Sequence, residues 1–157
     1  MSAANRRRGH DAERAVVKYL RENGYPDACT TRSKLGHDGS SPAGDVDFHP
    51  LICCEVKDVA RSAWPSWCRQ AVAEAREGMV PVVVRRTRGV PDVGAWECRW
   101  PEWAALGDGP LVSPMPARYR SLVRSAEEPE RVRGDWWMGE PFASFVERVR
   151  LVREVEG

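Results

Sequence analysis

The sequence has no long hydrophobic run, and its cysteines and histidines are few and scattered. A membrane-spanning helix needs about 18 or more consecutive apolar residues, so no such helix is expected. The N-terminus is basic but is not followed by an apolar stretch, which argues against a signal peptide. A cytoplasmic location is therefore expected, in the cytoplasm of the host cell if a phage encodes the protein. The five cysteines form no C-x-x-C pair, and the three histidines lie far apart, which predicts reduced thiols rather than disulfides or a zinc site.

A strong net charge of one sign is also missing, because the chain carries only +1 at pH 7. The basic residues are nevertheless clustered: eight Lys or Arg and four Asp or Glu lie between residues 6 and 34, and RRTR follows at 85–88. Such clusters on a neutral chain indicate either a surface that faces a polyanion or a solvated face. With 157 residues, the chain is long enough for one packed domain.

The apolar pattern predicts an α/β protein with a mixed sheet flanked by helices. The expected order is a helix at 9–23, a polar loop at 29–43 that can begin with a short strand, a hairpin of strands 45–48 and 51–57, a helix at 64–78 and a strand at 79–85. After residue 90 the chain becomes rich in Pro, Gly and Trp, with helices expected at 118–128 and 140–156. We therefore divide it into a core at 1–90 and an extension at 91–157 that packs on the core or at a dimer interface.

Charged residues occupy an otherwise apolar hairpin. Asp45 and Asp47 share one face of the first strand, and Glu55 and Lys57 share one face of the second. Carboxylates gathered at one place repel each other and favour a bound cation, and oxygen ligands suit Mg²⁺. Acids, a divalent ion and a lysine can together hydrolyse a phosphodiester. The alternative is a surface hairpin in which Glu55 and Lys57 are only neighbours.

Glu13 is a second unexpected acid, since it lies at the edge of the apolar stripe of the first predicted helix. A buried carboxylate is costly unless it is paired or binds a cation. The alternative is an edge residue that reaches solvent.

These motifs resemble the PD-(D/E)XK nucleases. Gly44-Asp45 stands for Pro-Asp, and Glu55-Val56-Lys57 for the second half of the signature. The order of elements over residues 6 to 88 is similar to that of the archaeal-type Holliday junction resolvases. The resemblance implies a restriction-endonuclease-like fold and a homodimer that nicks four-way DNA junctions with Mg²⁺, for which Mn²⁺ can substitute.

Carried over residue by residue, the resemblance assigns Glu13, Asp45 and Glu55 to the metal, and Lys57 to the attacking water or the transition state. Gln70 matches a polar residue of the following helix, and the serine of the preceding loop is Ser40 or Ser41. Asp47 is an extra acid that competes with Asp45. The residues assigned to DNA contact are basic, namely Arg6, Arg7, Arg8, Arg32 and Lys34.

Other functions remain open at this point. A related nuclease for repair or restriction-like cutting would use the same residues, and a non-catalytic DNA-binding module can share the fold. A small metal-binding or scaffold protein without nucleic acid is a fourth possibility. The seven tryptophans all follow residue 60 and either pack in the core or stack on bases, with Trp136-Trp137 as the pair to consider for stacking.

Overall fold

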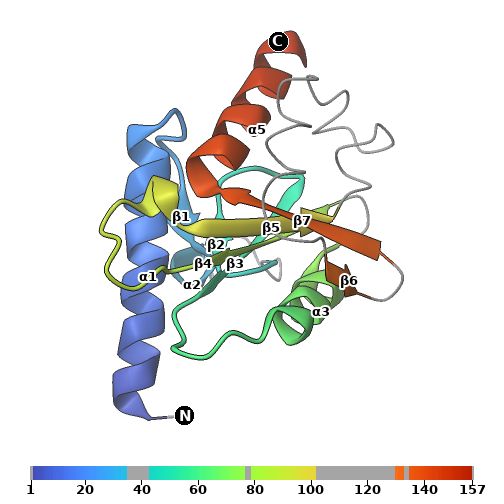
Figure 1. Ribbon diagram of the computed structural model, residues 1–157. Coiled ribbons are helices and arrows are strands. Elements are labelled where there is room, and N and C mark those ends of the chain that lie inside the picture. The colour runs from blue at the N-terminus through green and yellow to red at the C-terminus, as the bar shows by residue number, and fades with distance from the viewer. Residues whose placement is uncertain (1, 35–42, 77–78, 102–129, 133–134, 157) are drawn as a thin grey trace.

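A mixed β-sheet with helices on both faces forms the body of the protein in the computed structural model, which describes residues 2–34, 43–76, 79–101, 130–132 and 135–156 (Figure 1). In the described residues the sheet has seven strands in the order β1-β2-β3-β4-β5-β7-β6. Only β3 and β4 run parallel, and the other pairs are antiparallel. The predicted α/β class, with a mixed sheet flanked by helices and a C-terminal helix, is confirmed.

The first helix, α1 (Ala3–Glu22), begins at Ala3 rather than at residue 9, because the Ser2 side chain accepts a hydrogen bond from the Asn5 amide and caps it. It ends before Gly24, which has a φ of +100°. Its buried residues include Val16, Val17 and Leu20, the predicted apolar stripe. The helix therefore forms from the predicted pattern but is longer than predicted at its N-terminal end.

The predicted charged hairpin is present as β2 (Val46–Asp47) and β3 (Ile52–Lys57), which are antiparallel. Outside β2 lies the short strand β1 (Cys29–Thr30), which is followed directly by α2 (Thr31–Lys34). Strand β3 is central in the sheet, because it pairs with β2 on one side and with β4 on the other. The charges of the hairpin thus lie on an interior strand.

Helix α3 (Trp64–Glu74) connects β3 to the parallel strand β4 (Val80–Arg85). Pro65 lies in its first turn, where a missing N–H costs nothing. The helix ends at Glu74 and not at the predicted Gly78, since the next residue, Ala75, already has an extended backbone. Glu74 therefore occupies the last turn of the helix.

The C-terminal part of the chain adds strands that the sequence analysis did not predict. A 3₁₀ turn η1 (Val93–Ala95) leads into β5 (Glu97–Pro101), which pairs with β4. Strand β7 (Asp135–Pro141) lies between β5 and β6 (Glu130–Val132), and α5 (Phe142–Glu156) follows. The helix predicted at 118–128 lies outside the described residues.

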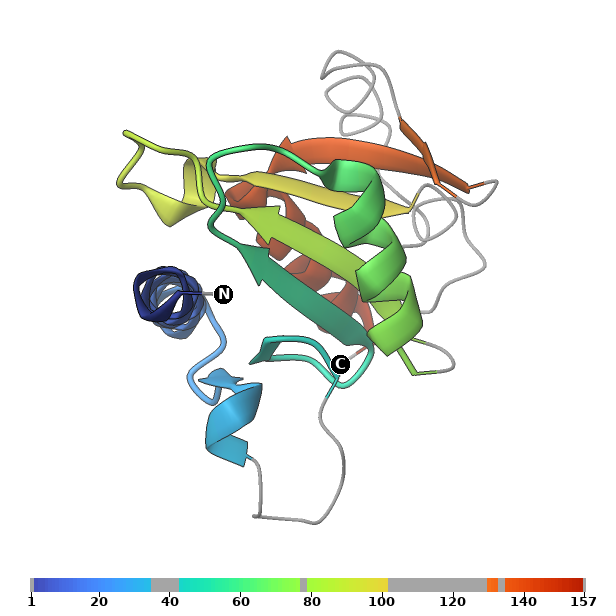
Figure 2. The same ribbon diagram turned by 90° about the horizontal axis from the view of Figure 1, so that it is seen from below.

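The two faces of the sheet bury different cores (Figure 2). Helices α1 and α5 pack with Ile52, Cys54 and Val56 of β3 on one face, whereas α3 covers the other face. Because side chains alternate along a strand, Cys53, Glu55 and Lys57 lie on the α3 side, as the period of two predicts. None of the described helices is long and apolar enough to cross a membrane.

Buried tryptophans and one buried ion pair hold the C-terminal elements to the sheet. Trp96, Trp100 and Trp137 are each at most 2% exposed. Of the two alternatives for the tryptophans, packing in the core therefore holds for Trp137, which is too deeply buried to stack on a base. The single N–H of the Arg148 Nε, on α5, donates a bifurcated hydrogen bond to both carboxylate oxygens of Glu140 on β7, at 2.7 and 2.9 Å.

Candidate active site

The turn before β2 fixes Asp45 against β3. Gly44 has a φ of +74°, and a Cβ at this position would lie 2.7 Å from the carbonyl oxygen of Cys54. The Asp45 amide donates to that same carbonyl at 2.8 Å, and the Asp45 Oδ2 accepts from the Val56 amide at 2.9 Å. Proline cannot replace Gly44 here because its ring holds φ near about −65°. The glycine in the place of the signature proline is thus required by this backbone.

Glu55 is the most deeply buried acid of the site. It is 1% exposed, and its Oε1 has no hydrogen-bond partner among the described residues. Burial, and after it the carboxylates of Glu74 and Asp45, raise the pKa of Glu55 to about 10. The protonated Glu55 in turn lowers the pKa of Glu74, because a carboxylic acid can donate a hydrogen bond to a neighbouring carboxylate. Three carboxyl groups therefore interact at this point of the structure.

Lys57 and Gln70 join β3 to α3 beside these acids. The Lys57 Nζ donates to the Gln70 Oε1 at 2.7 Å and lies 3.7 Å from the Glu55 Oε2. The Gln70 Nε2 donates to the Glu74 Oε1 at 3.2 Å and lies 3.5 Å from the Glu55 Oε2. The Lys57 side chain is 17% exposed, so its ammonium remains within reach of a substrate at the surface.

Glu13 forms a salt bridge with Arg32 of α2. It is buried in α1, and its Oε2 accepts two hydrogen bonds from Arg32 of α2, from Nε at 3.2 Å and from Nη2 at 2.6 Å. Helix α2 is itself attached to the Asp45 turn, because the Thr31 amide donates to the Asp45 carbonyl at 2.9 Å and its hydroxyl donates to the Gly44 carbonyl at 2.8 Å. Glu13 is thus connected to the site through a salt bridge.

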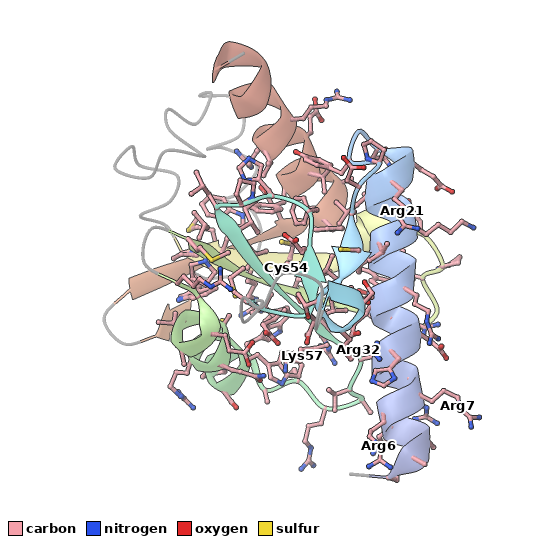
Figure 3. All side chains as sticks on the ribbon, turned by 180° about the vertical axis from the view of Figure 1, so that it is seen from behind. Arg6, Arg7, Arg21, Arg32, Cys54 and Lys57 are labelled. Atoms are coloured by element: carbon pink, nitrogen blue, oxygen red, sulfur yellow. The ribbon has the colours of Figure 1, made fainter. Side chains whose placement is uncertain are left out.

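The predicted DNA-contacting residues, the extra acid and the loop serines lie at different places in the chain. Arg6, Arg7 and Arg8 are exposed on the N-terminal turns of α1, as Figure 3 shows for the first two. In the same view Arg32 and Lys57 lie between α1 and α3. Asp47 pairs with Cys29 of the outer strand β1. Ser40, Ser41 and the side chain of Lys34 lie outside the described part of the chain.

Comparison with family models, with curated proteins and with solved structures finds no match for this chain. The resemblance to the PD-(D/E)XK resolvases therefore stays a prediction from the motifs.

A divalent cation fits part of the predicted ligand set. As the side chains stand, no group of three His, Cys, Asp or Glu among the described residues is arranged to hold a metal ion. Two of the predicted ligands suit one nonetheless: Asp45 is fixed beside β3, and Glu55 has a buried oxygen without a partner. Glu13 fits less well, because Arg32 already neutralises it. Asp45 and Glu55 are thus the residues that would hold the ion.

Glu74 is the site residue that the sequence analysis missed. It lies four residues after Gln70, so both side chains point from the same face of α3. Its position opposite Glu55 depends on how α3 crosses β3, which no local pattern encodes. The available signal was the spacing of Gln70 and Glu74, and it becomes informative only once Gln70 is assigned to the site.

Proposed function

We propose that this protein is a Mg²⁺-dependent DNA endonuclease with a restriction-endonuclease-like fold. The observation that carries the proposal is the buried Glu55 carboxyl group, which has one oxygen without a hydrogen-bond partner in the described part of the chain and lies beside Lys57 and the fixed Asp45. A structural role alone gives little reason to bury an acid among other acids, whereas a catalytic role gives one. This combination of groups suits phosphodiester hydrolysis.

The described residues suggest a separate role in catalysis for each of these side chains. Asp45 and Glu55 would hold a divalent ion, which when bound would polarise the phosphoryl oxygen and lower the pKa of the attacking water. Lys57 has three donors and uses one of them on Gln70, so it can orient that water or donate to a phosphate oxygen. Gln70 holds the lysine at 2.7 Å and thereby limits its position.

Basic side chains around α1 support DNA as the substrate. Besides the exposed Arg6, Arg7 and Arg8, a groove of about 580 Å³ between α1 and β1 contains Arg14, Lys18 and Arg21. Phosphate groups neutralised by such residues supply most of the affinity for DNA that is independent of sequence. No helix with an evident base-reading pattern is present among the described residues, so recognition by shape and backbone is proposed.

Within this class we propose a four-way junction as the substrate and a homodimer as the active form. The support is the resemblance of the motifs to the archaeal-type resolvases. A junction has two-fold symmetry, and a C2 dimer presents two sites to opposed strands. The measured mass in solution tests the dimer independently of activity.

The test is a cleavage assay on a four-way junction, a linear duplex and a single strand, with Mg²⁺, with Mn²⁺ and with EDTA. We expect paired, symmetric nicks in the junction that require the metal. Asp45→Asn should abolish cleavage and retain DNA binding, while the matched Asp47→Asn should still cleave. Equal cutting of all three DNAs would keep the site but replace the substrate with general DNA. Binding without cleavage by the wild type would instead indicate a DNA-binding module.

A further inference from the structure

The side-chain amide of Gln70 lies close to both Glu74 and Glu55. The Gln70 Nε2 lies 3.2 Å from the Glu74 Oε1 and 3.5 Å from the Glu55 Oε2. One residue from the last turn of α3 and one from the centre of β3 are thereby brought to the same point of the α3 face. Asp45 belongs to the same group, because its Oδ2 is bound by the amide of Val56, the residue next to Glu55.

The buried oxygen of Glu55 indicates that Lys57 alone does not satisfy this cluster. Glu55 is 1% exposed, and its Oε1 accepts no hydrogen bond among the described residues. The Lys57 Nζ forms an ion pair with the other oxygen, Oε2, at 3.7 Å and donates to Gln70. A buried polar atom without a partner is costly, and a hard cation supplies what the protein does not.

Glu13 is less suited to supply another ligand. Its Oε2 accepts two hydrogen bonds from Arg32, so binding a cation there would first require breaking a partly buried salt bridge. Glu74 makes no comparable ion pair in the described structure, and its side chain is exposed at the end of α3. An exposed glutamate can change rotamer at little cost.

We propose that Glu74, rather than Glu13, is the third carboxylate of a divalent-cation site formed with Asp45 and Glu55. A bound ion would draw the exposed Glu74 side chain toward Glu55, so that the three carboxylates could hold it together. Without this movement the described side chains form no such group of three. When ionised, the three carboxylates and the Lys57 ammonium leave two negative charges, which one divalent ion neutralises. This inference rests on the site of the proposed function but not on its substrate.

The test is titration of the full-length protein with Mn²⁺ alone, without DNA, by isothermal calorimetry. We expect Glu74→Gln to weaken Mn²⁺ binding at least tenfold and Glu13→Gln to change it less than twofold. Glu147→Gln, an exposed acid on α5, is the matched control and should bind as the wild type does. Circular dichroism of each variant verifies that it folds, which is expected because glutamine keeps the helix propensity of glutamate.

The outcomes separate this inference from the proposed function. Unchanged Mn²⁺ binding in Glu74→Gln together with weakened binding in Glu13→Gln would overturn the inference and leave the nuclease proposal intact. If Glu74→Gln binds Mn²⁺ more weakly and the wild type cleaves no DNA, the inference is supported and the nuclease proposal is overturned. A wild type that binds neither Mn²⁺ nor Mg²⁺ would overturn both.

Discussion

Replacing Glu55 by glutamine should stabilise the protein at pH 8 in the absence of divalent ions. The reference pKa of a glutamate is 4.5, and burial with two neighbouring carboxylates raises the pKa of Glu55 in the folded protein to about 10. Between pH 4.5 and pH 10 the Glu55 carboxyl group is therefore ionised in the unfolded chain but still protonated in the folded protein. The stability present below pH 4.5 is therefore lost progressively as the pH rises toward 10. Glutamine keeps the shape of the side chain and has no proton to lose.

The size of the effect follows from the width of this pH window. Each unit of pKa difference corresponds to ~1.4 kcal/mol. Since Glu55 is 1% exposed, solvent does little to screen the effect. Between pH 4.5 and pH 8 the wild type should lose roughly 3 to 5 kcal/mol relative to Glu55→Gln. At pH 4.5 and below, the two proteins should differ little.

Urea denaturation followed by tryptophan fluorescence, in EDTA at pH 4.5, 6 and 8, measures this difference. The control is Glu22→Gln, because Glu22 is exposed at the end of α1 and its replacement should change stability equally at all three values. If Glu55→Gln is no more stable than the wild type at pH 8, or if the difference does not grow with pH, Glu55 is not the buried acid described above.

Three further predictions concern the rest of the molecule. Gly44→Ala should lower the free energy of unfolding by about 3 kcal/mol or more, since it adds a backbone clash at 2.7 Å to the strain of a positive φ. The control Gly89→Ala, at a φ of +79° with no atom within 4 Å, should lower it by only about 1 kcal/mol. Equal losses in the two variants would disprove the clash. Glu140→Gln should cost about 3 to 5 kcal/mol in thermal or urea denaturation, because it leaves the Arg148 charge buried without its carboxylate, and a loss below 1 kcal/mol would contradict this. Iodoacetamide should label Cys29 alone in the native protein, as mass spectrometry would show, since the other four thiols are buried; modification of a second cysteine before unfolding would contradict the described burial.

Local patterns were enough to predict α1, the charged hairpin, α3 and β4, but not the short helix α2. The spacing of Val16, Val17 and Leu20 predicts the buried face of α1, and the alternation in β3 places Glu55 and Lys57 on one face. These features depend on residues close together in the sequence. The cap at Ser2 was missed because the apolar stripe begins later than the helix.

The arrangement of the C-terminal elements and of the acids could not be predicted in the same way. Strand β5 reads ECRWP and does alternate polar and apolar residues, but it is short and follows a turn rich in Pro and Gly. Its pairing with β4 and β7 is decided by the whole sheet. The salt bridge between Glu13 and Arg32 joins residues that lie on separate helices. In a sequence, Glu74 looks like any charged residue on a solvated helix face.

The place of β4 in the sheet has a consequence for synthesis on the ribosome. Strand β4 reads VPVVVR and is covered along its second edge by β5, which begins at Glu97. While residues 97–101 remain in the exit tunnel, the finished N-terminal part would expose an apolar strand with unsatisfied backbone groups, and such edges recruit strands from other chains. The nascent protein thus passes through a stage in which the candidate site residues have emerged but the strand that protects the sheet has not, and chaperone binding at this stage would prevent aggregation.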